Sequence, residues 1–241
     1  MTCPEPLTNE VLGPGGAVSA VGVHGAEGAN GVQAVYEDDD LLVLAKPSGL
    51  LCVPGRGPDK QDCLSTRVQQ RWPGALIVHR LDQATSGLVL MARHVDAQRR
   101  LSQAFAERQV HKRYQAVVSG LMGEVDGSWH TIDLPIAADW ERRPLRVIEH
   151  TLGKPSITRW RAVAHDSQTP TTRVELEPLT GRTHQLRVHL AAVGHAMAGD
   201  ALYADAATQA LAPRLLLHAC HLAFAHPVTG EALSIQLAAD F

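Results

Sequence analysis

Short apolar runs, each beginning beside a polar turn, place the strongest constraint on how this chain folds. The runs at 41–45 (LLVLA), 75–78 (ALIV) and 87–92 (GLVLMA) each follow directly on an Asp, Gly or Ser residue. Runs of this length that are rich in Leu and Val are typical of buried strands, since helices need longer segments. No run approaches the roughly 20 apolar residues that a membrane-spanning helix needs. We therefore predict a fold of many short strands, without a membrane segment.

The same kind of pattern predicts further strands and three helices. We expect strands at 113–120, 156–164 and 172–179, a closing hairpin at 222–237, and a strand from Ala75 that continues to Asp82. Helices are expected over 62–72, 97–109 and 183–194, with Asp96 and Thr183 as N-caps and Gly194 as a stop signal. The predicted fold class is α+β, with a mixed, largely antiparallel sheet and helices packed on it.

The first 31 residues differ in composition from the rest of the chain. They are rich in Gly, Ala and Pro and lack the basic start of a signal peptide. We expect residues 1–31 to form a disordered extension and residues 32–241 to form one domain. The four cysteines (Cys3, Cys52, Cys63 and Cys220) have no CxxC spacing, so reduced thiols in a cytoplasmic protein are expected.

The net charge of −3 is unevenly distributed along the chain. Residues 1–45 hold seven acidic residues and no Lys or Arg, and the remainder holds 22 basic and 18 acidic residues. Residues 66–113 alone carry nine basic residues against three acidic ones. Such a segment is typical of a surface that binds a polyanion, although a solvated helix face would also account for part of it.

Common catalytic motifs are missing from this sequence. It contains no GxGxxG after a strand, no GxxxxGK[ST], no HExxH and no GxSxG, which argues against nucleotide hydrolysis and cofactor-dependent redox chemistry. Thirteen histidines leave a metal site open as an alternative. His184 and His189 are badly spaced to share a metal, and His218 and His221 could share one only on a helix.

Asp82 is the residue whose position most needs an explanation. It lies between two apolar runs, in the segment VHRLDQATSG, with Arg80 two residues before it. One interpretation is structural: the carboxylate caps a turn by accepting the amides of Thr85 or Ser86. The other is catalytic, because an arginine beside a carboxylate keeps it ionised and nucleophilic, and rigid strand ends present reactive groups.

Several segments together resemble the RluA family of RNA pseudouridine synthases. HRLDQATSGLVL is similar to the family's catalytic signature HRLDxxTSGLLL, and EDDDLLVLAKPSGLLCVPG to its opening KPSG segment. KRYQAVV, TGRTHQLRVHLAAVGHAMAGDALY and RLLLHACHLAFAHPVTGE resemble three later family segments in the family's order. The likeness covers about residues 32–241 and implies the family's catalytic domain, with a central cleft.

The resemblance also implies roles for individual residues. Asp82 would be the catalytic aspartate, Arg187 would form an ion pair with it, and Tyr114 would lie against the uracil. Leu186 would pack on the other side of the base, and His79 and Thr85 would support the turn. Arg80 would fill the space that a flipped base leaves in the RNA stack. The remaining basic residues nearby (Arg99, Arg100, Arg108, Lys112 and Arg113) are candidates for contacts with the RNA backbone.

The expected substrates follow from a finer likeness within the family. DLPIAADWERRP followed by GKPSITRW is similar to members that act on both tRNA and 23S rRNA. The resemblance therefore implies stem-loops of tRNA and 23S rRNA as partners, no cofactor, no metal, and a cytoplasmic monomer. Two other interpretations are a catalytically silent RNA-binding module on the same scaffold and a metal-dependent hydrolase.

Overall fold

A computed structural model describes residues 18–20 and 31–241 of the chain. The prediction of a disordered extension at residues 1–31 therefore lies largely outside the described residues. Within that segment, β1 (Val18–Ala20) pairs in parallel with β13 (Ala232–Gln236) at an edge of the sheet.

One large sheet forms the frame of the molecule. Its main path runs β2-β3-β5-β12-β6-β11-β10-β7, with β4 paired to β5 and β13 paired to β12. The strands are β2 (Gln33–Glu37), β3 (Leu41–Lys46), β4 (Leu76–Ile77), β5 (Ser86–Ala92), β6 (His111–Ser119), β7 (His130–Asp133), β10 (Ile157–Asp166), β11 (Thr171–Pro178) and β12 (Leu217–Ala225). Only the β1–β13 and β5–β12 pairs are parallel among the described strands, so the predicted α+β class with a largely antiparallel sheet is confirmed.

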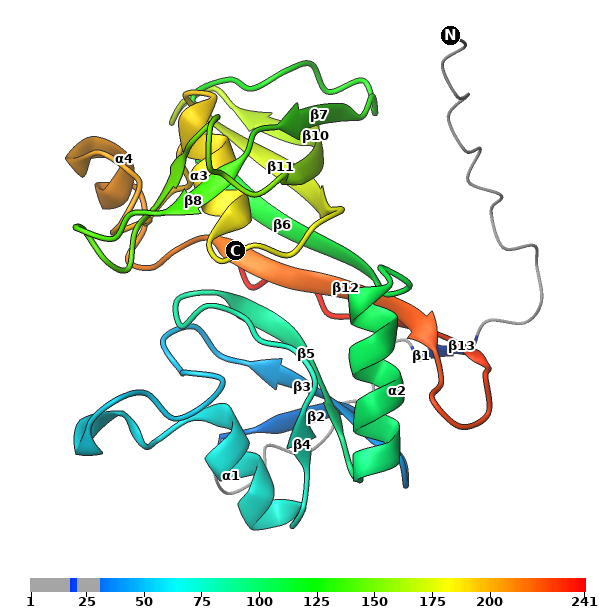
Figure 1. Ribbon diagram of the computed structural model, residues 1–241. Coiled ribbons are helices and arrows are strands. Elements are labelled where there is room, and N and C mark those ends of the chain that lie inside the picture. The colour runs from blue at the N-terminus through cyan, green and yellow to red at the C-terminus, as the bar shows by residue number, and fades with distance from the viewer. Residues whose placement is uncertain (1–17, 21–30) are drawn as a thin grey trace, which may run out of the picture.

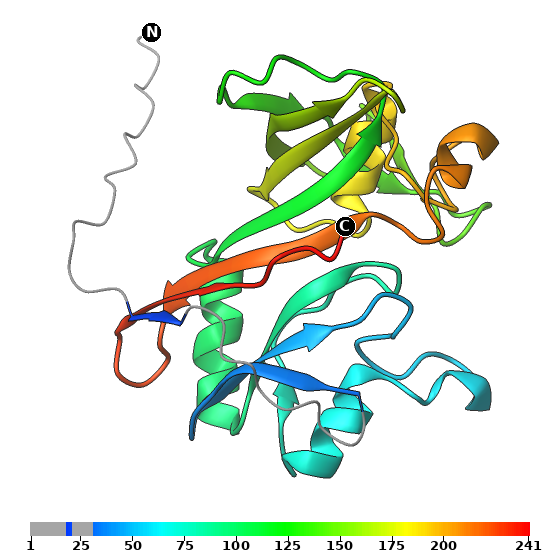
Figure 2. The ribbon, with the colours of Figure 1, turned by 180° about the vertical axis from the view of Figure 1, so that it is seen from behind.

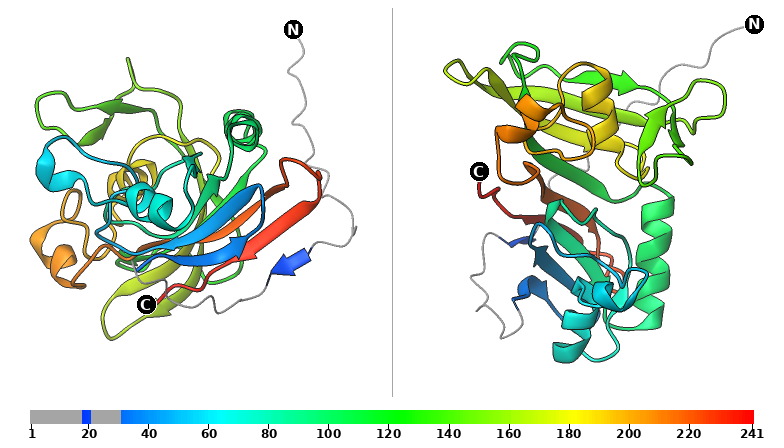
Figure 3. Two further views of the ribbon diagram at one scale, coloured as in Figure 1. Left: turned by 90° about the horizontal axis from the view of Figure 1, so that it is seen from below. Right: turned by 90° about the vertical axis from the view of Figure 1, so that its left-hand side faces the viewer.

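Two lobes lie on either side of the middle of this sheet (Figures 1 and 2). One lobe contains β2 to β5 with α1 (Leu64–Arg71) and α2 (Val95–Ala106), and Figure 3 shows α2 along one side of it. The other contains β6 to β11 with α3 (Gln185–Ala192), and α4 (Ala206–Ala210) lies beyond it. β12 passes between the lobes beside both β5 and β6. The segments that meet between the lobes form the site described below.

The apolar run in β5 is continuous because both faces of the strand are buried. Val89 and Met91 face the core beneath α1, whereas Leu88 and Leu90 face the core beneath α2. A strand that is covered on both faces has no solvent-facing positions, so polar alternation disappears. Gly87 must be glycine here, because its φ is +110° and an added Cβ would lie 2.3 Å from the backbone oxygen of Ala219.

Both predicted N-caps are wrong. α2 is capped by His94, whose Nδ1 accepts the Ala97 amide, and Asp96 lies inside the first turn. Thr183 precedes His184, which is the residue at the N-cap of α3 and has a left-handed backbone with φ 56°. In both helices a histidine occupies the cap position, and its ring also contacts a distant residue, Asp40 for His94 and Tyr203 for His184.

The strand expected from Ala75 to Asp82 ends at Ile77, because the chain then turns away from β5 into the space between the lobes. Five of the described strands were not predicted: β1, β2, β7, β8 (Ile136–Ala138) and β9 (Arg146–Ile148). Each has only three to five residues, so no clear apolar period develops. No helix in the described part of the chain has the length and apolar character to span a membrane.

Candidate active site

A cleft of about 680 Å³ lies between the lobes, a volume in the range of small-molecule and nucleotide sites. Its walls come from residues 79–85, 105–114 and 178–187, together with Leu217. Five basic side chains line it (Arg80, Arg108, Lys112, Arg182 and Arg187), and Asp82 is the one carboxylate among the lining residues. The cleft is therefore suited to an anionic ligand, with a single acidic group inside.

The turn that carries Asp82 is held by the KPSG segment. The buried Lys46 ammonium donates to the carbonyls of Pro47, Leu50 and Gln83 at 2.8, 2.8 and 3.1 Å. The Ser48 hydroxyl donates to the Ala84 carbonyl at 2.7 Å, and the Gly49 amide donates to the Gln83 carbonyl. Burial lowers the pKa of Lys46 to about 8, which still leaves the group mostly protonated at neutral pH and able to donate to these three carbonyls. The KPSG segment thus holds the backbone of the turn that carries Asp82.

The Asp82 carboxylate does not cap its own turn. The Thr85 amide bonds instead to the backbone oxygen of Asp82 at 3.1 Å. Within the described residues, the carboxylate accepts no hydrogen bond, and its side chain is 28% exposed in the cleft. Its nearest basic side-chain atoms are Nε2 of His184 and Nη1 of Arg187, each 3.9 Å from Oδ2. The turn-capping interpretation is therefore wrong, and the carboxylate is left facing the cleft.

Arg187 has a second and closer acidic partner. Its Nε and Nη2 bond to the two oxygens of Asp200 at 2.8 and 2.5 Å, and the side chains are 5% and 0% exposed. A bidentate pair of this kind orients the guanidinium rigidly. The third nitrogen, Nη1, is the one that faces Asp82. The expected ion pair with Asp82 is thus a looser contact on a cation already fixed by Asp200.

Asp200 was not predicted as a site residue. It lies in the HAMAGDALY segment among small residues, where no local pattern distinguishes a buried carboxylate from a turn residue. It also accepts the amides of Leu202 and Tyr203, so it organises the turn as well as Arg187.

His184 forms the other contact with Asp82 and was considered only as a metal ligand. Its Nδ1 lies 2.6 Å from the Tyr203 hydroxyl, which accepts the Arg146 amide at 3.0 Å. The hydroxyl proton is then free to bond to Nδ1, which leaves the imidazole N–H on Nε2, toward Asp82. Burial lowers the pKa of His184 and the Asp82 charge partly opposes that shift, so a neutral hydrogen-bond donor faces the carboxylate.

Tyr114 and Leu186 lie on the walls of the same cleft. Burial, and secondarily the Asp82 charge, raises the pKa of the Tyr114 phenol. Leu186 belongs to the core beneath β6 and β11 and also contributes to the cleft lining. Its position is therefore compatible both with core packing and with contact to a bound ring.

Arg80, His79 and Thr85 occupy the turn as expected, but in different environments. Arg80 is exposed in the cleft, and its guanidinium has no hydrogen bond or ion pair to any residue that the structure describes. Thr85 is buried. Nε2 of His79 accepts the Leu90 amide at 3.0 Å, and the ring stacks on Phe105 at 4.5 Å. His79 therefore supports the turn, and Arg80 is free to contact a ligand.

The half-buried His79 makes the stability of the protein depend on pH. Burial lowers its pKa to about 3, against an ordinary value of 6.5. Between these values the unfolded chain binds more protons, so the free energy of unfolding falls as the pH falls below about 6.5. In urea unfolding from about pH 7 to about pH 5, we expect the wild type to lose about 2 kcal/mol more than His79→Gln. Glutamine keeps an acceptor for Leu90 but does not titrate; equal losses in both proteins would contradict this origin.

The other basic residues proposed for RNA contacts are not all in one place. Arg108 and Lys112 line the cleft. Arg99 pairs with Asp96 on the surface, Arg100 donates to the Pro227 carbonyl, and Arg113 pairs with Glu177. The charge-rich segment therefore divides into cleft residues and ordinary surface pairs.

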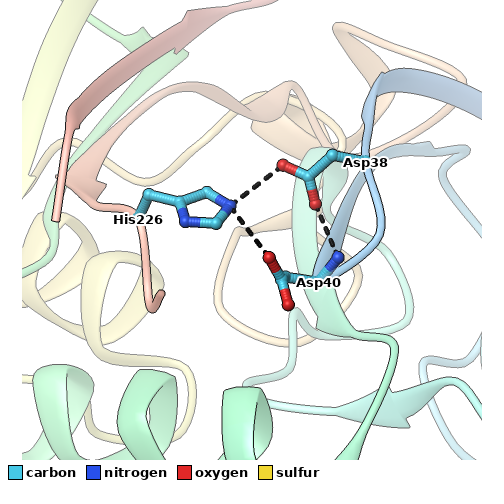
Figure 4. Close-up of side chains that lie close together, drawn as sticks. All are labelled: Asp38, Asp40 and His226. Carbon is cyan, nitrogen blue, oxygen red and sulfur yellow. Dashed lines mark hydrogen bonds and ion pairs between the residues drawn. The ribbon is translucent and has the colours of Figure 1, made fainter. Parts of the chain in front are cut away.

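In the described part of the chain, the histidines that bear on a metal site are already bonded to protein groups. His189 is buried, with its ring nitrogens bonded to the Thr158 hydroxyl and the Leu134 carbonyl. Asp38, Asp40 and His226 cluster away from the cleft (Figure 4). There, Nδ1 of His226 accepts the amides of residues 228 and 229, which places the proton on Nε2, toward both carboxylates. The proton thus occupies the position that a metal would need, and the cluster links the β2–β3 turn to the β12–β13 hairpin.

Comparison with known proteins assigns the class of protein. The family described as RNA pseudouridylate synthase matches residues 40–192, a range that includes Asp82, Tyr114 and Arg187. The chain belongs to this family and is an RNA pseudouridine synthase, an isomerase that converts uridine in RNA to pseudouridine. The family prediction is therefore confirmed.

Particular relatives share most of the chain. The dual-specificity RNA pseudouridine synthase RluA of Escherichia coli strain K12 is 44% identical over 207 residues, which cover 86% of this chain and 93% of that protein. RluA of Haemophilus ducreyi is 42% identical over 210 residues, covering 87% and 94%. Human RNA pseudouridylate synthase domain containing 1 has a TM-score of 0.73 and 32% identity, covering 87% of this chain and 84% of that one. Human RNA pseudouridylate synthase domain containing 4, with a TM-score of 0.67 and 23% identity, shares the fold.

Proposed function

We propose that this enzyme modifies uridines in stem-loops of tRNA and of 23S rRNA, as a cytoplasmic monomer, and that Asp82 carries the chemistry. The observation that supports this most directly is the position of Asp82, the one carboxylate lining a cleft whose other charged walls are basic. The cationic walls suit an RNA backbone, and the dual specificity in the names of the RluA relatives supports two kinds of RNA substrate.

The reaction breaks the N1–C1′ bond of uridine and forms a C5–C1′ bond. The proton on C5 is lost and N1 gains one, so the product is an isomer and neither water nor an oxidant is consumed. In our proposal Asp82 acts as nucleophile or base at the ribose side of the target. Arg187, itself fixed by Asp200, would keep the Asp82 carboxylate ionised and aligned.

The walls of the cleft would hold the detached ring while it turns. Tyr114 would lie against the uracil and Leu186 on its other side, since both side chains line the cleft. Because burial raises the pKa of Tyr114, it would contact the ring as a neutral phenol. In accepting the C5 proton it would pass its own proton to the nearby Asp82 carboxylate. Nε2–H of His184 would donate to a ribose oxygen placed between it and Asp82, because the 3.9 Å separation is too long for a direct hydrogen bond to the carboxylate.

The substrate assignment can be tested in RNA from a strain that lacks this gene. Pseudouridines would be mapped in tRNA and in 23S rRNA, with and without a plasmid that restores the wild-type protein. We expect one or more sites in each RNA to be lost and restored together. Loss in only one of the two RNAs would contradict dual specificity, and no loss in either would contradict both proposed substrates.

Arg80 would fill the gap left in the RNA when the target nucleotide flips out. Extruding a stacked base costs about a few kcal/mol, and a guanidinium can take over part of the stacking. We expect Arg80→Ala to lower turnover on a folded stem-loop by about a hundredfold, and far less on an unstructured oligonucleotide that contains the same uridine. Single-turnover rates on both RNAs measure this. Arg182→Ala, which removes an equal charge from the cleft lining, is the control and should affect the two RNAs alike; an unchanged rate for Arg80→Ala on the stem-loop would refute the role.

A further inference from the structure

We propose that the tip of the β8–β9 hairpin is a second RNA-binding site, in which Trp140 stacks on an unpaired base outside the target uridine. This inference rests on the proposed function, because it assumes an RNA stem-loop in the cleft. It adds a specificity contact on a segment that does not line the cleft itself.

Trp140 is unusually accessible for a tryptophan. Its residue is 71% exposed, and it is the one large hydrophobic residue exposed within 136–148, all of which the structure describes. The Arg143 guanidinium lies 4.0 Å from the centre of the indole ring. Arg143 thus covers one face of the ring, and the exposed fraction requires that much of the rest is open to solvent. A stacked cation and indole with an open face form a platform for another flat ring.

The base of the hairpin is anchored beside the cleft. The Arg146 amide donates to the Tyr203 hydroxyl, which bonds to His184 next to Asp82. At the other end of the hairpin loop, the Asp139 carboxylate accepts both the amide and Nε of Arg142. Trp140 is six positions along the chain from Arg146, in a loop whose backbone is bonded at both ends. A nucleotide near the flipped uridine is the part of the substrate that this platform would meet.

The charge between the two sites favours RNA as the occupant. The Arg146 guanidinium has no hydrogen bond or ion pair to the described residues, and its Nε is buried without a partner. Its charge is near enough to His184 to contribute to the lowering of that residue's pKa. An unpaired guanidinium beside the cleft and a stacking ring beyond it match the phosphate and the base of a loop nucleotide. A single exposed indole is too small an apolar area for a stable protein interface.

The test compares Trp140→Ala with Trp140→Phe on whichever stem-loop the wild type modifies. We expect Trp140→Ala to raise Kd and KM about 10-fold, with kcat changed less than twofold, because the platform binds substrate without touching the reacting atoms. Trp140→Phe keeps an aromatic ring and should stay within about threefold of the wild type. Val228→Ala, which truncates an exposed residue on the β12–β13 hairpin, is the control for a nonspecific surface effect.

The salt dependence of RNA binding tests the role of the Arg146 charge. Arg146→Gln should reduce the slope of log Kd against log salt concentration by about 0.7 to 0.9, the value for one lost phosphate contact. If the wild type forms pseudouridine but Trp140→Ala binds and reacts with unchanged constants, this inference is wrong and the proposed function stands. If the wild type forms no pseudouridine in any RNA tested, the proposed function itself is contradicted. An equal loss of RNA affinity in Trp140→Ala and Val228→Ala would also contradict the stacking role of Trp140.

Discussion

Asp82→Asn is expected to lower pseudouridine formation about a thousandfold or more, because the amide can act neither as nucleophile nor as base. The side chain keeps its size, and the turn is held by Lys46 and Ser48 through backbone atoms rather than through the carboxylate. The fold should therefore be retained. The measurement is the single-turnover rate on a stem-loop, with tritium release from C5 of the uridine as the signal.

Two controls separate catalysis from binding and folding. Asp96→Asn removes an exposed carboxylate that pairs with Arg99, and should leave the rate unchanged. RNA affinity of Asp82→Asn should stay near the wild-type value, since the basic walls of the cleft remain. If Asp82→Asn restores normal pseudouridine levels in RNA from a deletion strain, the catalytic assignment is wrong.

Asp200→Ala is expected to lower the free energy of unfolding by about 3 to 5 kcal/mol, the usual effect of breaking a buried ion pair. The loss leaves the Arg187 guanidinium, 5% exposed, without its closest acceptor. It also removes the acceptor of two turn amides. Urea unfolding followed by circular dichroism measures the change. We further expect pseudouridine formation to fall, because Arg187 is no longer held in the orientation that faces Asp82.

The matched control is another Arg–Asp pair on the surface. Asp240 pairs with Arg214 and its side chain is 71% exposed. Asp240→Ala should cost less than about 1 kcal/mol, because solvent replaces the partner. If Asp200→Ala lowered the free energy of unfolding no more than Asp240→Ala does, Arg187 would have to be held by Asp82 alone. The contact with Asp82, rather than that with Asp200, would then be the stronger one.

Local sequence was sufficient for the parts of the fold that depend on local or periodic burial. The runs at 41–45 and 87–92 lie within β3 and β5, because strands covered on both faces are marked by continuous apolar side chains. The helices α1, α2 and α3 lie close to their expected ranges, because the apolar period of a helix can be seen in the local sequence whichever segment packs on it. The caps were missed, because His94 and His184 take their positions from contacts with distant segments.

By itself, the sequence determined the family, the strand-rich fold class, and the residues that meet in the cleft: Asp82, Tyr114 and Arg187 all line it. Only the tertiary structure decided how those residues are held. Asp200 fixes Arg187, Tyr203 sets the proton of His184, and Lys46 holds the turn of Asp82 across 37 residues of chain. The physical reason is that a buried polar group needs a partner at hydrogen-bond distance, and that partner can come from any part of the chain. Apolar burial follows a period along the sequence, whereas pairing between polar groups does not.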